Sequence, residues 1–196
     1  MPIVKEFLSQ RGLTLSEEKT KITRIEDGFD FLGQNLRKFN NKLITKPAKS
    51  SVKSFTQKVG DIIRECRGSN ATKLIDRLNP VIRGWCNYHK YVQSGRTFGT
   101  IDTNIYFLLM KWGRRKHGNK TPKWIRNHYW SNSEDCKHFS SYNKVKHKIA
   151  ELVRPIDIKL HRYYKIKGET NPFNTENLEY YKMRWFAKNS KPISIT

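Results

Sequence analysis

The stretch LNPVIRGWCNYHKY, residues 78–91, decides how this chain is expected to fold. Each residue of an α-helix is turned by about 100° from the last, so residues three or four positions apart share a face. One side of such a helix carries the apolar set Leu78, Val81, Ile82, Trp85, His89 and Val92. The other side carries Arg83, Asn87, Lys90 and Tyr91. The stretch therefore predicts an amphipathic helix in which Trp85 and His89 are interior residues rather than catalytic ones.

Helical spacing continues on both sides of this stretch and predicts a bundle of three or more helices. Asn79-Pro80 is typical of an N-cap followed by a proline at the first helical position, so this helix is predicted to begin there, after a short helical turn. An earlier helix is predicted from the shared face of Val52, Phe55, Val59, Ile62, Ile63 and Cys66. A third follows a loop at residues 94–99 and carries Ile101, Ile105, Leu108 and Trp112, and a shorter one follows Thr121-Pro122.

The two ends of the chain differ in character from residues 47–130. Residues 1–46 predict a short helix ending at Gly12, strands at 20–25 and 29–37 around a turn at 26–28, and a turn at Asn40-Asn41 before residues 43–45. Residues 131–196 are basic and loop-rich with helical parts, and their clearest break lies at 168–175. The predicted fold class is mainly α: a helical bundle at 47–130, preceded by a small β-meander at 1–46 and followed by a loop-rich helical segment at 131–196.

The charge of the chain indicates a polyanionic partner. Lys and Arg number 39 against 17 Asp and Glu, a net charge of +22. The excess is concentrated in residues 47–130, which carry 17 Lys and Arg against 4 Asp and Glu. Such a surface is the usual electrostatic footprint of nucleic-acid binding. The cations of this segment, with one amide and one aromatic ring among them, are the candidate RNA contacts: Lys53, Arg64, Arg83, Asn87, Lys90, Tyr91, Arg96, Lys111, Arg114, Arg115, Lys116, Lys120 and Lys123.

The sequence lacks the familiar catalytic and metal-binding patterns. It contains no glycine-rich phosphate loop, no HExxH, no Gly-x-Ser-x-Gly, no paired CxxC and no Asp-Asp pair. The grouping Cys136-Lys137-His138 with His147 matches no standard zinc spacing, so no catalytic residue, metal or cofactor is predicted in this chain. Three widely spaced cysteines suggest a reducing compartment, and the longest apolar run, Ile105 to Met110, is far short of the roughly 20 residues of a membrane span. We expect a soluble protein of a bacterial-type cytoplasm, with an organelle as the alternative and no membrane partner.

Three segments, in order along the chain, resemble one protein family. Residues 7–20, FLSQRGLTLSEEKT, and 28–33, GFDFLG, resemble the end of the palm domain in group II intron-encoded reverse transcriptases. Residues 78–88, LNPVIRGWCNY, with Thr97-Phe98 and the cluster at 112–117, are similar to the maturase-specific domain, the thumb also called domain X. Residues 165–168, KIKG, and 171–173, NPF, resemble the region after the thumb, where a DNA-binding segment begins.

This resemblance implies a role in binding rather than in chemistry. In the family, the thumb grips a template–primer duplex and helps to hold intron RNA in its splicing-competent shape, while the splicing chemistry belongs to the RNA. Phe31, Leu32 and Gly33 would correspond to the part of the palm that steadies the primer end. The family's fingers and most of its palm, with the Tyr-x-Asp-Asp motif that binds the catalytic metals, would precede residue 1, and the cysteine-paired HNH endonuclease of many members is missing. Polymerase activity is therefore not expected of this chain alone, and Mg²⁺ is expected only with the missing palm.

Several functions remain open from the sequence. The leading hypothesis is a fragment of a group II intron reverse transcriptase/maturase that binds intron RNA and assists splicing, with reverse transcription during intron mobility in the full protein. DNA target or template–primer duplex is a further possible ligand. One alternative is a subunit that completes an RNA-directed DNA polymerase in trans with a separate palm and fingers polypeptide. Others are a general basic nucleic-acid-binding protein and a decayed remnant whose apolar faces in residues 1–46 stay exposed.

Overall fold

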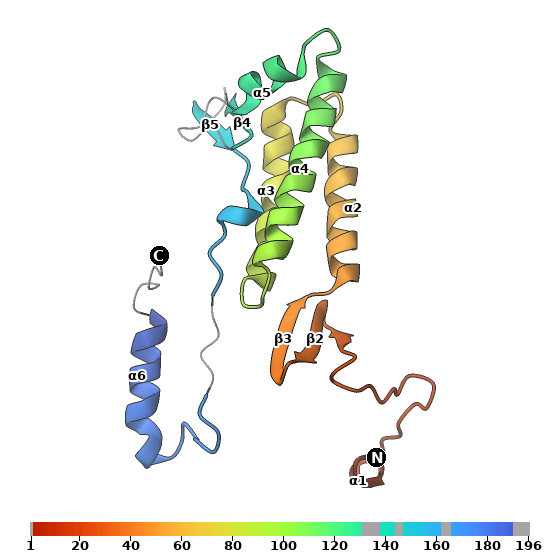
Figure 1. Cartoon of the computed structure of the whole chain (residues 1–196), viewed down its shortest axis with the longest axis vertical. Coiled ribbons are helices and arrows are strands. Elements are labelled where there is room, and N and C mark those ends of the chain that lie inside the picture. The colour runs from red at the N-terminus through yellow and green to blue at the C-terminus, as the bar shows by residue number, and fades with distance from the viewer. Residues whose placement is uncertain (1, 131–137, 144–146, 162–165, 190–196) are drawn as a thin grey trace.

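The bundle predicted for the middle of the chain is the centre of the structure. The computed structural model describes residues 2–130, 138–143, 147–161 and 166–189 (Figure 1). Helices α2 (Lys49–Glu65), α3 (Ala71–His89) and α4 (Gly95–Lys116) run alongside one another, and α5 (Pro122–Trp130) lies at the upper end of the bundle (Figure 1). The fold is mainly α with a small antiparallel β-meander, as the sequence predicts.

Helices α2 and α4 form where the apolar spacing predicts them, because each buries one face against the other. Helix α2 buries Phe55, Val59, Ile62 and Ile63 on the predicted stripe. The loop expected at residues 94–99 is shorter than predicted, since α4 already begins at Gly95. Ser94 ends that loop, and its hydroxyl donates a hydrogen bond to the backbone carbonyl of His89 at 2.8 Å. The Ser94 hydroxyl thus gives a hydrogen-bond partner to a backbone carbonyl at the end of α3, so a longer loop is unnecessary.

Helix α3 is longer than predicted, and its predicted start at Asn79-Pro80 is wrong. The helix begins at Ala71, where the Asn70 side chain caps it by accepting a hydrogen bond from the Lys73 backbone N–H at 2.9 Å. Pro80 lies inside the helix on its exposed side, where water can bind the backbone carbonyl that lacks a partner because proline has no N–H. The amide of Asn79 is used elsewhere: it donates to the carbonyl of Glu151 at 2.9 Å and accepts from the Val153 N–H at 2.8 Å.

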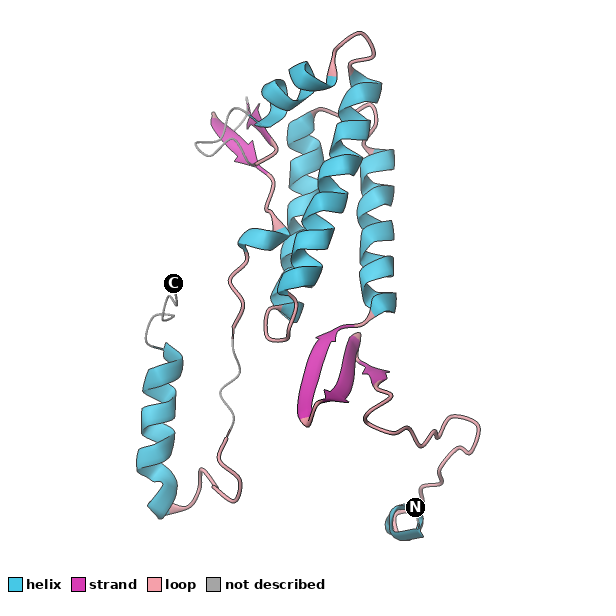
Figure 2. Ribbon diagram, in the orientation of Figure 1, coloured by secondary structure: helices cyan, strands magenta, loops and turns pink. Residues whose placement is uncertain are grey.

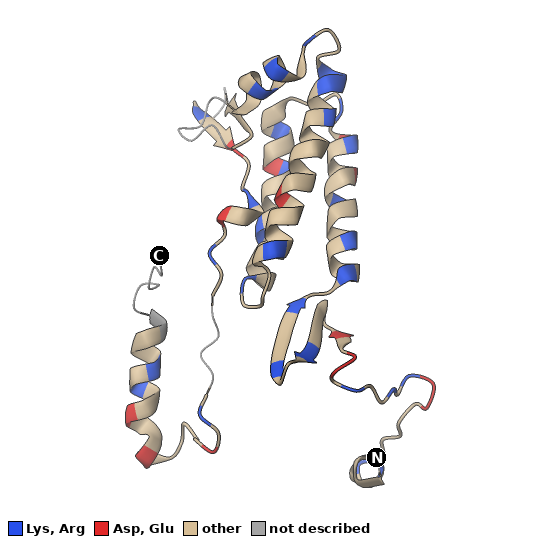
Figure 3. Cartoon of the chain, viewed as in Figure 1, with Lys and Arg blue, Asp and Glu red and all other residues tan. Residues whose placement is uncertain are grey.

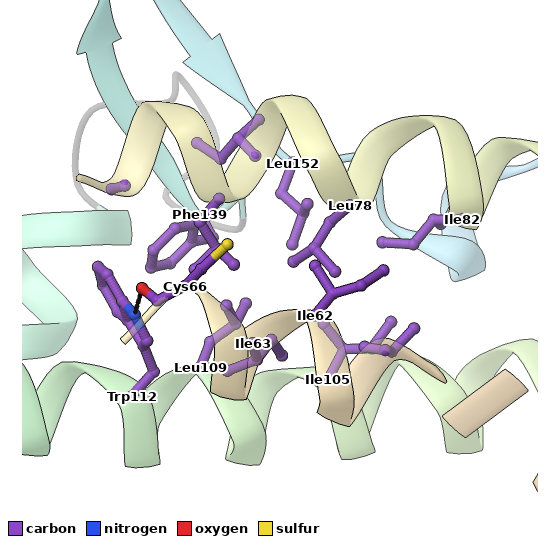
Figure 4. Close-up of a cluster of buried hydrophobic side chains, with 14 of the residues drawn as sticks. Ile62, Ile63, Cys66, Leu78, Ile82, Ile105, Leu109, Trp112, Phe139 and Leu152 are labelled. Carbon is purple, nitrogen blue, oxygen red and sulfur yellow. Dashed lines mark hydrogen bonds between the residues drawn. The ribbon is translucent and has the colours of Figure 1, made fainter. Parts of the chain in front are cut away.

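The core draws on all three long helices and on residues beyond the bundle. Figure 4 shows Ile62 and Ile63 of α2 facing Leu78 and Ile82 of α3, with Ile105 of α4 below them. Phe139 and Leu152 fill the space beside this cluster and are almost completely buried. Residues on both sides of position 130 therefore belong to one core, although the predicted domain boundary at that position stays a prediction.

The segment after α5 contains a β-hairpin that the sequence did not predict. Strands β4 (Ser140–Asn143) and β5 (Lys148–Glu151) pair antiparallel, with Ser140 opposite Glu151, and lie beside α5 in Figure 2. The chain then forms a single helical turn, η1 (Pro155–Asp157), against α4. There Arg154 binds the carboxylate of Asp102 at 2.9 Å. The turn η2 (Thr175–Asn177) leads into α6 (Leu178–Asn189), so this segment has the helical parts that were expected.

The predicted β-meander is present, but its strands have other bounds. Strands β1 (Phe29–Phe31), β2 (Gln34–Phe39) and β3 (Lys42–Pro47) form an antiparallel sheet in that order. The strand predicted at 20–25 is wrong, and the one predicted at 29–37 is divided by a turn at Leu32 and Gly33. Their φ angles of +48° and +74° are those of a two-residue hairpin turn, which a glycine makes easy. The second turn, at Asn40-Asn41, is confirmed.

Residues before the sheet contribute little to the core. Helix α1 (Pro2–Ser9) forms as predicted and is followed by Gly12 with a φ of +67°, the left-handed conformation expected of a helix stop. Its apolar side chains are exposed, as for Ile3 at 79% and Phe7 at 54%. Figure 1 shows α1 separated from the bundle by an extended segment. Several large apolar side chains of residues 1–46 are thus exposed, as the decayed-remnant alternative expects, and that alternative itself stays a prediction.

Gly113 of α4 permits the close packing of α5, and this gives a first testable prediction. A Cβ atom at Gly113 would lie 2.6 Å from Cγ2 of Ile125, which is completely buried and branched at its own Cβ. Gly113→Ala is therefore expected to lower the free energy of unfolding by about 1–2 kcal/mol, because overpacking outweighs the better helix propensity of alanine. Chemical denaturation measures this change.

A double-mutant cycle supplies the control for Gly113. In an Ile125→Ala background the added methyl group of Gly113→Ala has room, so we expect it to be neutral or stabilising there. If Gly113→Ala costs the same free energy in both backgrounds, contact with Ile125 is not the cause.

Candidate nucleic-acid interface

The structure brings four cations together in one groove between α2 and α4. The groove encloses about 240 Å³ and is lined by Gly60, Ile63, Arg64, Arg67, Leu108, Lys111, Trp112 and Arg115. Arg64 and Arg67 come from the end of α2 and the loop that follows it, whereas Lys111 and Arg115 lie one turn apart on α4. We call these four cations the basic groove. Figure 3 shows Lys and Arg spaced along α2 and gathered at the upper end of α4.

The local sequence explains why cations collect at this end of the bundle. Both helices end here, and the partial negative charge of a helix C-terminus favours positive side chains. Arg64 forms an ion pair with Asp61 on the preceding turn. Within the part of the chain that the structure describes, no carboxylate pairs with Arg67, Lys111 or Arg115. The basic groove therefore keeps most of its positive charge for a ligand.

Glycine keeps the floor of the basic groove open. Gly60 lies in the middle of α2, and a Cβ atom added there would meet no atom within 4 Å. Lys53 lies three helical turns before Arg64, on the same side of α2, and is exposed. The line from Lys53 to Arg64 spans about 16 Å, given the rise of 1.5 Å per residue. The predicted contacts Lys53, Arg64, Lys111 and Arg115 are thus compatible with one extended polyanion.

Lys116 and Arg114 differ although they are neighbours at the end of α4. Lys116 extends back to the loop after α2, where its ammonium group donates to the carbonyl of Ser69 at 2.7 Å. The same ammonium lies 5.2 Å from the ring of Trp112, so Lys116 has a structural use. Arg114 is exposed, with no ion pair among the described residues. Arg114 is the better candidate of the two for contact with RNA.

A second group of cations and rings lies around α5. Lys123 and Arg126 line a hollow with Tyr106, Met110, Pro122 and Asn127. On α5 the ring of Trp124 stacks on His128 at 4.6 Å, and the ammonium of Lys120 lies 5.4 Å from the Trp124 ring. Arg126, Trp124 and His128 were not among the predicted contacts. Stacked rings beside cations suit nucleobases as well as phosphates.

His117 connects the cations and rings around α5 to the buried residue Tyr129. Its Nε2 lies 2.8 Å from the hydroxyl of Tyr129, within hydrogen-bond distance. Burial lowers the pKa of His117, and the charges of His128, Lys116 and Lys120 lower it further. The lowered pKa favours the neutral imidazole.

A third set of predicted contacts lies towards the C-terminal end of α3 and at the start of α4. The ammonium of Lys90 donates to the side-chain carbonyl of Asn87 at 3.2 Å and lies 5.3 Å from the ring of Tyr91. Arg83 on α3 and Arg96 at the start of α4 are both exposed. These residues are far along the bundle from the basic groove, which is at the opposite ends of α2 and α4. The thirteen predicted contacts therefore do not form a single site.

Trp85, Cys86 and His89 of residues 83–91, RGWCNYHKY, pack towards the interior. Trp85 stacks on Phe55 at 4.6 Å and donates its indole N–H to the hydroxyl of Ser51 at 3.3 Å. His89 is buried, and its Nε2 lies 3.3 Å from the same hydroxyl. Burial lowers the pKa of His89 and raises that of the Cys86 thiol to about 12. The interpretation of this stretch as structural on its inner face is confirmed, although Trp85 is only half-buried.

The predicted primer-grip residues form part of the contact between the meander and the bundle. Tyr88 of α3 donates its hydroxyl to the carbonyl of Leu32 at 2.6 Å. The N–H of Ala48, just before α2, donates to the carbonyl of Gly33 at 3.0 Å. Phe31 and Leu32 nevertheless keep 59% and 71% of their surface exposed. The hairpin turn is thus fixed in position while its apolar side chains face outward.

The described residues show neither a metal-binding cluster nor a membrane-spanning helix. Within them, no three His, Cys, Asp or Glu side chains are grouped closely enough to hold a metal ion. Cys136 of the CKH grouping lies outside the described residues, and His138 pairs with Asp157 at 3.5 Å. Among the described helices, none is both long and apolar enough to cross a bilayer.

Comparison with known families finds a match for the bundle. Residues 52–130, which comprise nearly all of α2 and the whole of α3, α4 and α5, match the family described as "Group II intron, maturase-specific domain". This segment is similar to the group II intron maturase-specific domain. The resemblance to the C-terminal region of group II intron maturases is thereby confirmed.

Two curated relatives that resemble this chain also carry the name of a maturase-like protein. The chain is 29% identical over 91 residues to "Maturase-like protein 1" of Euglena gracilis, which is 45% of this chain and 20% of that protein. It is 28% identical over 88 residues to "Maturase-like protein 1" of Euglena longa, covering 43% of this chain and 19% of that protein. The match spans about a fifth of the length of these relatives.

Proposed function

We propose that this chain binds group II intron RNA through its maturase-specific domain and assists splicing by stabilising the folded RNA. The observation that carries this proposal is the basic groove between α2 and α4, where three of four cations have no acidic partner among the described residues. Fixed cations on rigid helices match phosphates that are fixed by RNA structure. In this role the protein supplies binding and positioning, and the reacting groups belong to the RNA.

A salt titration tests the proposal directly. If the basic groove and its flanking cations contact several phosphates, the logarithm of the association constant should fall steeply with the logarithm of salt concentration, by about 0.7–0.9 per phosphate contact. We expect a slope of about −4 or steeper for structured intron RNA, measured by filter binding or fluorescence anisotropy. A slope near zero would exclude the phosphate contacts.

An unrelated structured RNA of equal length is the control for specificity. Weaker binding of this RNA would support an intron partner, because phosphate contacts alone do not distinguish RNAs except by shape. Equal affinity for both RNAs would favour the alternative of a general basic nucleic-acid-binding protein. Contact of residues 131–196 with DNA remains a proposal, and a duplex DNA titration of the same chain addresses it.

One further candidate function rests on the apolar side chains of residues 1–46. Phe31, Leu32, Phe39 and Leu43 are all more than half exposed, and so is Ile3 of α1. Large apolar surfaces of this kind usually bind a partner. We propose as the second candidate that a separate palm and fingers polypeptide covers them, which would complete an RNA-directed DNA polymerase with its own Mg²⁺. Co-purification with a polypeptide bearing Tyr-x-Asp-Asp would support it, and polymerase activity unchanged by the addition of this chain would refute it.

The site of action follows from the partner in this proposal. A maturase meets its intron where the intron is transcribed, so we propose a bacterial-type cytoplasm or an organelle as its location. Imaging of the tagged chain together with its intron RNA tests this.

A further inference from the structure

A second groove, between α2 and α3, is separate from the basic groove. It is an open groove of about 560 Å³, lined by Ser51, Ser54, Phe55, Lys58, Pro80, Val81, Gly84 and Trp85. Residues two positions apart on a helix point about 200° apart, so Lys58 and Gly60 face opposite sides of α2. Lys58 lines this groove and Gly60 lines the basic groove. Helix α2 therefore has a groove on each side.

Gly84 is the least expected residue of this second groove. Glycine in a helix interior is destabilising relative to alanine, and Gly84 lies in the middle of α3 without a positive φ. A Cβ atom added at Gly84 would meet no atom within 4 Å, so packing does not require glycine there. Gly113 of α4 is the contrasting case, since its Cβ would clash with Ile125. Neither the backbone nor the core explains Gly84, whereas the open groove above it does.

The lining of the groove combines an apolar wall with polar groups. Trp85 is held in place by its stack on Phe55 and by its hydrogen bond to Ser51. Pro80 and Val81 continue this apolar wall along α3. Ser54 and Lys58 line the groove from α2, one helical turn apart, and supply a hydroxyl and an ammonium group. An apolar wall beside a hydrogen-bonding group and a cation matches a nucleotide, with its flat base, polar base edge and phosphate.

We propose that this groove accepts an unpaired nucleobase of the RNA that the chain binds, with the base against Pro80, Val81 and Trp85 and its phosphate at Lys58. This inference rests on the proposed function, because it needs RNA as the partner. A partner protein that inserts an apolar side chain is disfavoured by charge, since the lining contains one cation and no carboxylate in a chain of net charge +22. The absence of a side chain at Gly84 gives the base its space.

The test is to fill the groove from Gly84 and to measure binding of two RNAs. One is a short RNA duplex with a single-stranded tail, and the other is the same duplex without the tail. Gly84→Leu should weaken binding of the tailed RNA by about tenfold, because contact between a base and an aromatic wall is lost. Binding of the blunt duplex should stay unchanged. Gly84→Ala should have an intermediate effect, since its single methyl group fills less of the groove.

Two controls separate this effect from loss of folding and from added apolar bulk. Gly84→Leu should melt at the same temperature as the parent chain or higher, because leucine is the better helix former and nothing obstructs its Cβ. Ser50→Leu places the same side chain on α2 outside the groove lining, and it should leave the binding of both RNAs unchanged. A 4-thiouridine in the tail should photo-crosslink to residues of the groove in the parent chain, and Gly84→Leu should abolish that crosslink.

The possible failures are distinguishable. If the parent chain binds neither RNA, the proposed function fails together with this inference. If the parent chain binds both RNAs and Gly84→Leu changes neither affinity nor crosslink, only the groove inference is overturned. Equal weakening of tailed and blunt RNA by Gly84→Leu would also overturn it, because a base from a duplex is not free to enter the groove.

Discussion

Trp112→Ala is expected to lower the free energy of unfolding by about 3–5 kcal/mol, the largest loss of any single substitution proposed for this chain. Trp112 is 2% exposed and lies between α4, α5 and the strand segment, with ring centroids 5.5 Å from Tyr129 and 5.9 Å from Phe139. Its indole N–H also donates to the carbonyl of Cys66 at 3.0 Å, where α2 ends (Figure 4). Removing the ring thus opens a cavity and releases the end of α2 at the same time.

A milder variant separates these two contributions. Trp112→Phe keeps most of the buried ring but removes the N–H, so a loss of about 1–2 kcal/mol is expected for the hydrogen bond and the smaller volume. Trp185→Ala is the matched control, because Trp185 of α6 is 61% exposed and should be nearly neutral. Urea denaturation followed by far-ultraviolet circular dichroism measures all three variants. A loss for Trp112→Ala that does not exceed that for Trp185→Ala would contradict the core assignment.

The position of Trp112 also links the core to the candidate interface. The residue lines the basic groove with Lys111 and Arg115, although its own ring is almost entirely buried. A change at Trp112 therefore displaces the cations as well as destabilising the fold. Binding by Trp112 variants is meaningful only at temperatures where circular dichroism shows them folded.

Helical periodicity predicted the bundle because its apolar faces are buried against one another. The stripes of α2 and α4 follow the 3.6-residue period closely, so packing and propensity agree there. The start of α3 was mispredicted because Asn79-Pro80 carries a strong local signal that tertiary contacts override. Asn70 caps the helix instead, and the Asn79 amide holds the chain at Glu151 and Val153. The hydrogen bonds of Asn79 with Glu151 and Val153 form only in the folded chain, so the local sequence around Asn79 could not predict them.

The β-hairpin after α5 had no signal of its own in the sequence. Its strands, SSYN and KIAE, lack regular alternation of apolar and polar residues. Packing against the helical bundle stabilises the hairpin, because Phe139 and Leu152 at its ends are buried in the bundle core. Ser140 adds a hydrogen bond from its hydroxyl to the carbonyl of Tyr129 at 3.2 Å. A segment that is stabilised by packing against the helical bundle cannot be predicted from its own sequence pattern.

The candidate site was predicted as a set of residues but not as a place. The excess of positive charge lies in residues 47–130, and the contacts predicted there include three of the four cations of the basic groove. Arg67, in the loop after α2, was not among the predicted contacts. The packing of α2 against α4 determines which cations share a groove. Contacts such as the hydrogen bond from Lys116 to Ser69 determine which cations already have a partner within the protein. Both depend on contacts between residues that are distant in the sequence.

Reversing two charges of the basic groove is expected to cause the largest loss of RNA binding. Lys111→Glu combined with Arg115→Glu should weaken the affinity for structured RNA on the order of 100-fold at about 0.1 M salt, since two phosphate contacts become repulsive. The slope of log affinity against log salt should become shallower by about 1.5–2. Both side chains are exposed on α4, so the melting temperature should change little.

A charge-matched control decides whether the groove or only the net charge matters. Lys73→Glu combined with Lys148→Glu changes the net charge by the same amount, but these exposed residues on α3 and β5 do not line the basic groove. Long-range attraction alone would weaken binding equally in both double variants, whereas contact in the groove weakens it mainly in the first. An equal loss would therefore remove the basic groove as the binding site while leaving the chain an RNA-binding protein. A loss confined to Lys111 and Arg115 would place the phosphates between α2 and α4.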